Sequence, residues 1–275
     1  MKGLLRTRLH LGRQTIAWPD GPARFPERFR ARPALHPERC GEGCQACEAA
    51  CPTEAISGAA SKALALDTGA CTFCGLCEEA CPEQAIAFTR DYRLSARSRE
   101  ALVVRGDEPQ RVAALDARMK RLFGRSLKLR QVSAGGCNGC EAELNAAGNI
   151  QFDLSRFGIQ FVASPRHADG LVVTGPVTEN MREALLATWE AVPAPKLLIA
   201  VGACACSGGP LAGSPVCSGG LQGVIPGVAV DLWIPGCPPH PVTLLDGLLR
   251  LLGRIEGDDL RLEGTGIVEP RGDGR

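Results

Sequence analysis

The stretch CTFCGLCEEACP, residues 71–82, sets four cysteines and a proline in the pattern C-x2-C-x2-C-x3-C-P. An earlier copy exists, because CQACEAACPTEAI at residues 44–56 matches CGLCEEACPEQAI at residues 74–86 at 8 of 13 positions. Such self-similarity indicates two copies of one supersecondary unit, related by an approximate twofold axis. Each copy is expected to contain a cysteine loop, a short helix ended by proline and a short strand.

The cysteine spacing in these copies predicts two iron-sulfur clusters. Three thiolates on a tight loop reach three iron corners of one cubane, whereas the fourth cysteine, on the following helix, reaches only the neighbouring cubane. We therefore expect crossed ligation of two 4Fe-4S clusters. The first set of ligands is Cys40, Cys44, Cys47 and Cys81, and the second set is Cys71, Cys74, Cys77 and Cys51.

The first copy departs from the pattern by one extra residue between its first two cysteines. Gly41 and Gly43 make such an expanded loop sterically feasible. Structural zinc is the alternative, since C-x2-C pairs also hold tetrahedral zinc. Two four-cysteine runs with Pro52 and Pro82 in register favour iron-sulfur clusters.

Composition describes a globular chain of 275 residues that is 45% hydrophobic and 22% charged. No apolar run approaches the eighteen residues needed to cross a bilayer. The first 18 residues contain arginines where a secretory signal needs an unbroken apolar core, and they lack a twin-arginine pair. We expect a cytoplasmic protein, in which 14 cysteines indicate metal binding rather than disulfides.

Charge is arranged in blocks around the cysteine-rich module. Residues 1–39 carry six more basic than acidic side chains, residues 40–89 six more acidic, and residues 90–125 five more basic. The basic arms lack interleaved aromatic residues and flank an acidic module, which argues against nucleic acid and for acidic partners or anionic lipid. Leucines and arginines within residues 4–16 are compatible with an interfacial helix.

From residue 127 onward, short apolar runs alternate with helical patterns. This alternation predicts an α/β domain with a mostly parallel sheet covered on both faces. The expected strands are residues 127–132, 159–164, 170–175, 196–202 and 230–236, and the expected helices are residues 178–191 and 242–252. A further helix is expected near residues 112–122, with Val112, Leu115, Met119 and Leu122 at helical spacing.

Four later cysteines each follow the carboxyl end of an expected strand. They are Cys137, Cys140, Cys204 and Cys237. Because the carboxyl ends of parallel strands line the crevice where ligands bind, these cysteines are expected to converge on a third 4Fe-4S cluster. Cys206 and Cys217 are alternatives to Cys204, although small buried cysteines are the interpretation we favour for both.

Two glutamates lie beside these cysteines. Glu141 and Glu143 are candidates for a proton relay, or are acids favoured at a helix N-terminus. The chain has neither a phosphate-binding glycine loop nor a G-x-S-x-G nucleophile motif, so it offers no catalytic residue of its own.

These motifs identify a resemblance. CNGCE at residues 137–141, SPRHADGLVVTGPVT from residue 164, LIAVGACACSGG from residue 198 and IPGCPPHP from residue 234 resemble the small subunit of membrane-bound nickel-iron hydrogenases and its homologue in respiratory complex I. Residues 3–90 resemble the two-cluster ferredoxin-like subunit of the same assemblies, here fused into one polypeptide.

The resemblance implies a flavodoxin-like α/β domain preceded by a small α+β ferredoxin-like domain. It implies that Cys137, Cys140, Cys204 and Cys237 hold the proximal cluster, and that the chain contacts a large catalytic subunit, an electron-donor subunit (a ferredoxin or a dehydrogenase) and membrane subunits on the cytoplasmic face of the inner membrane. The spaced CNGC motif follows the hydrogenase branch. The lack of a Tat signal and of a C-terminal extension favours the energy-converting class related to formate hydrogenlyase.

The sequence thus predicts an oxidoreductase subunit that relays single electrons through three 4Fe-4S clusters. Its expected parts are a basic arm at residues 1–35, the ferredoxin-like domain at 36–90, a basic linker with a docking helix at 91–125, the proximal-cluster domain at 126–256 and a disordered tail at 257–275. The alternatives are a nickel-free complex I-like quinone reductase subunit and a stand-alone ferredoxin-type carrier.

Overall fold

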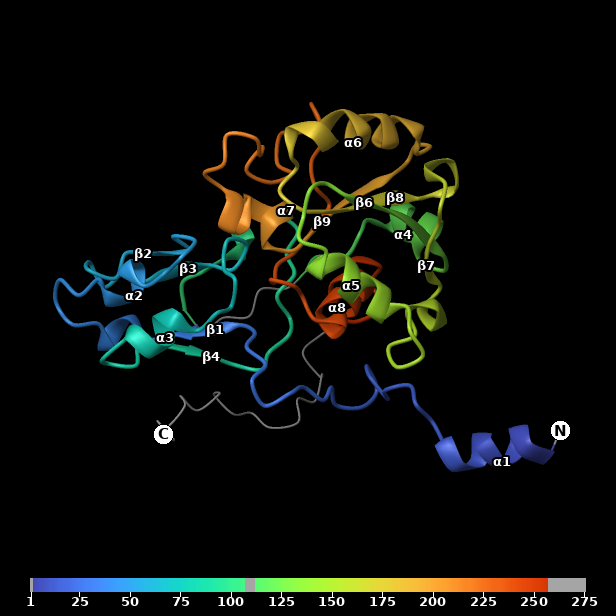
Figure 1. Cartoon of the computed structure of the whole chain (residues 1–275), viewed down its shortest axis with the longest axis horizontal. Helices are drawn as coiled ribbons and strands as arrows, with labels where there is room; N and C mark the ends of the chain where they lie inside the picture. Colours follow the sequence, from blue (N-terminus) through green and yellow to red (C-terminus); the bar gives the residue numbers. More distant parts are fainter. Residues whose placement is uncertain (1, 107–111, 257–275) are drawn as a thin grey trace.

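Five parallel strands form the central sheet of the C-terminal module in the computed structural model, which describes residues 2–106 and 112–256 (Figure 1). The strands are β6 (Leu127–Ser133), β7 (Ile159–Phe161), β8 (Gly170–Thr174), β9 (Leu197–Val201) and β10 (Leu232–Ile234). Their spatial order is β10-β9-β8-β6-β7, which is the flavodoxin-like order. The predicted fold class is confirmed, and all five strands lie within the predicted segments or extend one by a single residue.

Helices cover both faces of this sheet. Helix α5 (Gly139–Ala147) packs against α8 (Pro241–Leu251) on one face, and α6 (Glu179–Ala191) covers the other (Figure 1). Strands β8 and β9 are buried at every position because apolar clusters lie on both sides of them. Because all five strands run parallel, their carboxyl ends lie at the same edge of the sheet.

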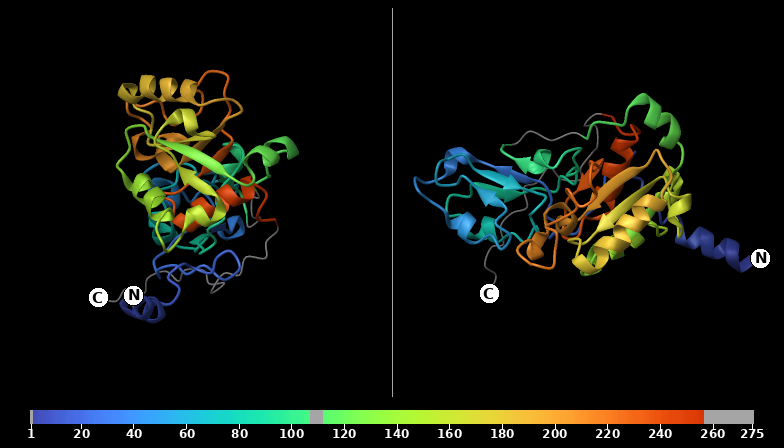
Figure 2. Two further views of the ribbon diagram at one scale, coloured as in Figure 1. Left: turned by 90° about the vertical axis from the view of Figure 1, so that its right-hand side faces the viewer. Right: turned by 90° about the horizontal axis from the view of Figure 1, so that it is seen from above.

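The ferredoxin-like module lies beside this edge (Figures 1 and 2). Its helices are α2 (Ala46–Ala49) and α3 (Leu76–Ala80), which pack together, and its strands are β1 (Pro33–Leu35), β2 (Ile56–Ser57), β3 (Ala65–Asp67), β4 (Ile86–Phe88) and β5 (Val103–Val104). Strand β1 pairs with β4, and β3 pairs with both β2 and β5. Each sequence copy thus supplies a cysteine loop, a short helix and a strand, as predicted.

Both segments interpreted as basic arms contribute strands to this module. Strand β1 lies in the predicted N-terminal arm, and β5 lies in the predicted linker. Elsewhere in the linker, Ala96 forms an antiparallel bridge with Trp233 of β10. The proposed domain division therefore stays a prediction, and these segments connect the two modules rather than only flank them.

The predicted docking helix is shorter than the apolar spacing suggested. Helix α4 (Ala117–Phe123) begins after Asp116, whose carboxylate accepts hydrogen bonds from the N–H groups of Arg118 and Met119 at 2.8 and 2.9 Å. Val112 and Leu115 are buried ahead of the helix, whereas Leu122 is 52% exposed. The prediction of one apolar helical stripe is therefore wrong.

The N-terminal helix α1 (Lys2–Leu11) projects away from both modules (Figures 1 and 2). The chain after it returns to the C-terminal module, where buried Trp18 donates a hydrogen bond to the Tyr92 hydroxyl at 2.7 Å. Within the described ranges, no helix is long and apolar enough to span a bilayer. The predicted disordered tail lies outside the described residues.

Short 3₁₀ helices complete the connections. They are Pro37–Arg39, Glu100–Leu102, Leu154–Phe157, Pro165–His167 and Gly209–Leu211.

Candidate iron-sulfur sites

The eight cysteines of the ferredoxin-like module line two separate spaces, which we call site 1 and site 2. Site 1 is lined by Cys40, Cys44, Cys47 and Cys81. Site 2 is lined by Cys51, Cys71, Cys74 and Cys77. In each site three cysteines come from one copy and the fourth comes from the other, which is the crossed arrangement that the sequence predicts.

Backbone amides are directed at the cysteine sulfurs. The N–H groups of Ala55 and Ala85 each donate to the sulfur four residues earlier, Cys51 Sγ and Cys81 Sγ, at 3.2 Å. These two bonds are equivalent under the 30-residue repeat. Hydrogen bonds of this kind favour thiolate over thiol and are among the contacts by which a protein adjusts an iron-sulfur cluster.

The donor chemistry of sites 1 and 2 fits a cationic metal centre. Burial, with a smaller contribution from the charges of neighbouring cysteines, raises the pKa of Cys47 to about 11 and that of Cys71 and Cys77 to about 12. Thiols with pKa values this high would stay protonated at neutral pH unless metal replaced the protons. Iron supplies that positive charge.

Over residues 2–106 and 112–256, no three Cys, His, Asp or Glu side chains converge as the ligands of a single metal ion would.

Three strand ends of the parallel sheet form a third cysteine group, which we call site 3. Cys137 and Cys140 lie at the start of α5 after β6, Cys204 lies on α7 (Ala203–Ser207) after β9, and Cys237 follows β10. The last two loops are joined by a hydrogen bond from Ala203 N–H to the Gly236 carbonyl at 2.8 Å. The topology therefore gathers residues that are far apart in the sequence.

Glycine allows these loops to approach each other. Gly202 has φ +91°, and a Cβ there would overlap Cys140 Sγ. Burial raises the pKa of Cys140, and the charges of Glu141, Cys204, Cys237 and Cys137 add to the effect. The four predicted ligands thus interact with one another, although their assignment to a cluster stays a prediction.

The other two cysteines lie differently. Cys206 is fully buried in the apolar cluster on the α6 face of the sheet. Cys217 forms a backbone bridge with Thr178 and affects the pKa of Cys204 less than Cys237 and Cys137 do. These positions agree with the interpretation of Cys206 as a small apolar residue and leave Cys217 at the margin of site 3.

The two candidate relay glutamates have opposite environments. Glu141 is buried and accepts a hydrogen bond from Thr174 Oγ1 at 2.6 Å. Burial acts to raise its pKa, but the hydrogen bonds from Ser133 and Thr174 outweigh it and lower the pKa below its usual value. Glu141 therefore ties α5 to the ends of β6 and β8.

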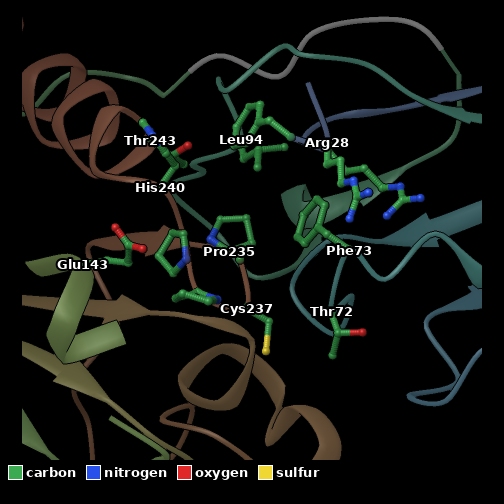
Figure 3. A pocket seen from close by; sticks show the side chains of 14 residues that line it. Arg28, Thr72, Phe73, Leu94, Glu143, Pro235, Cys237, His240 and Thr243 are labelled. Atoms are coloured by element: carbon green, nitrogen blue, oxygen red, sulfur yellow. The ribbon is translucent and has the colours of Figure 1, made fainter. Parts of the chain in front are cut away.

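Glu143, in contrast, faces a cavity of about 270 Å³ between the two modules (Figure 3). Burial raises the pKa of its carboxyl. Cys237 and His240 line the cavity from the C-terminal module, and Thr72 and Phe73 line it from the ferredoxin-like module. The loop of site 2 therefore faces site 3 across this cavity.

One arginine connects the ferredoxin-like module to the C-terminal module. The Arg99 guanidinium pairs with the Asp67 carboxylate at 2.5 and 2.8 Å, and its Nε donates to the Cys206 carbonyl at 2.9 Å. Beside it, Ser207 Oγ donates to the Gly69 carbonyl at 3.1 Å. The sequence does not predict this contact, because Arg99 is one of several arginines in a basic linker and no local pattern distinguishes it.

Comparisons with known proteins agree with both modules. Residues 137–251 match the family described as NADH ubiquinone oxidoreductase, 20 Kd subunit, and residues 39–86 match the 4Fe-4S dicluster domain.

Individual relatives come from several redox complexes. The chain is 40% identical over 148 residues to a probable membrane-bound hydrogenase subunit, mbhJ, of Pyrococcus furiosus, covering 54% of this chain and 87% of that protein. It is 43% identical over 145 residues to formate hydrogenlyase subunit 7 of Escherichia coli, covering 53% of this chain and only 56% of that relative. It is 45% identical over 118 residues to an NADH-quinone oxidoreductase subunit of Heliobacterium modesticaldum, covering 42% of this chain and 66% of that relative.

A parallel sheet that gathers cysteines at its strand ends, joined to a 4Fe-4S dicluster domain, defines an iron-sulfur subunit of an oxidoreductase. The chain belongs to the family of the NADH ubiquinone oxidoreductase 20 kDa subunit, together with the hydrogenase and formate hydrogenlyase subunits that it resembles.

Proposed function

We propose that this chain relays single electrons through three 4Fe-4S clusters to or from a large catalytic subunit of a membrane-associated, hydrogenase-type complex. The observation that carries the proposal is the grouping of twelve cysteines into three sets of four, two in the dicluster domain and one at the strand ends. When bound, each cluster accepts and gives up one electron at a time.

The arrangement of the modules supports an order for the relay. Thr72 and Phe73 of the site 2 loop line the same cavity as Cys237 of site 3, and Arg99 ties the two loops together. Site 1 is not among the groups that line this cavity. Electrons therefore enter or leave the ferredoxin-like module at site 1, and site 2 exchanges them with site 3.

Site 3 faces the catalytic subunit in this proposal. Cys137 and Cys237 are exposed in the chain alone, so the surface around them is free to be covered by a partner. Glu143, which lines the cavity beside Cys237, is the better placed of the two glutamates to exchange protons with solvent or with that partner. Glu141 acts by holding α5 in place.

The membrane association rests on the relatives and on α1. A relative named as a membrane-bound hydrogenase subunit supports an association with a membrane. In this proposal the chain lies on the cytoplasmic face of the inner membrane, next to membrane subunits. Exposed Leu4 and Leu9 alternate on α1 with basic residues, which suits the surface of an anionic bilayer.

Elemental analysis tests the proposal on the complex purified natively through a tag on this chain. We expect about twelve iron atoms per chain and stoichiometric nickel in the accompanying large subunit. The same iron content in a complex whose large subunit lacks nickel would identify the alternative, a quinone-linked relative of complex I. A monomer purified without any large subunit would favour a stand-alone carrier.

A further inference from the structure

One half of the ferredoxin-like module has a largely buried cation against its cysteine loop. Arg30, before β1, lies against the loop of site 2, where its Nη1 donates to the Cys74 carbonyl at 3.1 Å. Its Nε lies 3.6 Å from the Glu78 carboxylate and its Nη2 lies 3.8 Å from that of Glu79. The Arg30 side chain is 20% exposed and that of Glu78 is 7% exposed. The guanidinium is therefore largely withdrawn from water.

The repeat makes room for this guanidinium in the second copy. Gly75 has φ +86°, and a Cβ there would overlap the guanidinium of Arg30. The equivalent position in the first copy is Gln45, and the position equivalent to Glu79 is Ala49. The close approach of Arg30 is thus specific to site 2.

The two copies share one glutamate on the short helix. Glu48 accepts a hydrogen bond from Ala59 N–H at 2.8 Å, and Glu78, at the matching position, accepts one from Phe88 N–H at 3.1 Å. In both copies this bond ties the short helix to the segment after it.

Cations near site 1 are more exposed than Arg30. Arg39 donates a hydrogen bond to the Gln84 carbonyl at 3.4 Å. Lys62 lowers the pKa of Cys40, but less than any of the other causes changes it. Both side chains are exposed to solvent. Water and salt screen such charges, whereas a buried guanidinium acts through a lower effective dielectric constant.

We propose that Arg30 makes the two ferredoxin clusters inequivalent by raising the reduction potential of the cluster at site 2 above the value it would otherwise have. A cluster gains one negative charge on reduction, so a nearby buried cation stabilises the reduced form. Arg30 also lines the cavity between site 2 and Cys237. The electron is then held preferentially on the cluster that faces site 3. This inference rests on the proposed function, since it needs clusters at both sites.

Redox titration of the full-length, iron-loaded protein, followed by electron paramagnetic resonance, tests the inference. Iron is measured first, and about twelve atoms per chain establish the clusters independently. Far fewer irons in the unsubstituted protein would reject the proposed function and this inference with it. The site 2 signal is assigned by its loss in a Cys77→Ala variant.

Arg30→Gln is expected to lower the midpoint potential of the cluster at site 2. At a fixed solution potential, the ratio of reduced to oxidised cluster at site 2 should then fall several-fold. Arg30→Lys retains the charge and is expected to restore most of the potential. The double variant Arg30→Gln with Glu78→Gln has no net change of charge. Its site 2 midpoint potential is expected to return toward that of the unsubstituted protein. Arg39→Gln is the matched control and should leave site 2 unchanged.

An unchanged site 2 potential in Arg30→Gln would overturn the inference, as would an equal shift in Arg39→Gln. If Arg30→Gln loses iron, Glu79→Gln replaces it, because removing this exposed negative charge should move the site 2 potential in the positive direction. No shift in Glu79→Gln, or a shift of the same size at site 1, would then overturn the inference.

Discussion

Gly202 is the residue on which the packing of site 3 most directly depends. Its φ of +91° is strained for any residue with a side chain, and a Cβ would overlap Cys140 Sγ. We predict that Gly202→Ala loses the site 3 cluster, so that iron falls by about four atoms per chain. Gly213→Ala is the control, since a Cβ there meets nothing within 4 Å. Equal iron in both variants would show that the close approach at Gly202 is dispensable.

His240 is an uncharged histidine at the start of α8. Its Nδ1 accepts a hydrogen bond from Val242 N–H at 3.2 Å, and its ring contacts those of Phe25, Phe29 and Phe152. Burial lowers its pKa to about 4. Because the folded state resists protonation and the unfolded state does not, the folded state loses stability as the pH falls from about 6.5 toward 4.

We predict that lowering the pH from 7.5 to 5.5 costs the native protein about 1 kcal/mol more than it costs a His240→Asn variant. Asparagine keeps an oxygen to cap α8 but does not titrate. Denaturant unfolding of both proteins at the two pH values measures this difference. Parallel loss of stability in the two proteins would mean that His240 is already accessible to protons.

At the scale of elements, sequence reasoning succeeded where a pattern is local. Continuous apolar runs predicted the five strands, because this pattern depends on neighbouring residues. The cysteines of sites 1 and 2 group as their spacing suggests, and their crossed ligation of clusters stays a prediction. The helix around residues 112–122 was predicted from spacing alone. Asp116 caps that helix instead and fixes its start, so Val112 and Leu115 are buried ahead of the helix rather than on a helical face.

Helix α1 is the element whose role is least determined by the rest of the fold. Leu4 and Leu9 are 81% and 83% exposed, and no acidic residue opposes the arginines around them. We predict that substituting both leucines with glutamate reduces binding to vesicles of anionic lipid several-fold, since apolar burial and charge attraction are both weakened. Vesicle flotation measures the bound fraction.

The control for α1 is Leu122→Glu on α4, which changes a leucine that is 52% exposed. It should leave flotation unaffected. If the α1 variant floats as well as the unsubstituted protein, or if neither binds at any salt concentration, α1 is not a lipid contact.

At the scale of the whole molecule, the contact between modules depends on residues that no local pattern could reveal. Asp67, Arg99 and Cys206 are far apart in sequence, and their meeting follows only from how the two modules pack. The same holds for the strands that the basic arms add to the ferredoxin-like module. Long-range pairing of this kind is decided by the tertiary fold.

We predict that Arg99→Gln loosens the contact between modules, because it leaves the Asp67 carboxylate without its guanidinium and removes a bond to the Cys206 carbonyl. The expected cost is about 2 kcal/mol in unfolding free energy. The magnetic coupling between the clusters of sites 2 and 3 should weaken, while iron content stays the same. Arg182→Gln, an exposed substitution on α6, serves as control. Unaltered coupling in Arg99→Gln would argue that other contacts suffice.

If the ferredoxin-like module holds two clusters and the C-terminal module holds the third, Cys237→Ser should remove one cluster only. Cys237 belongs to site 3 alone, on a loop that follows β10. Iron analysis and electron paramagnetic resonance of this variant are expected to show a fall from about twelve to about eight irons per chain and the loss of one signal. Both ferredoxin signals should remain. Loss of all three signals, or of none, would contradict the account.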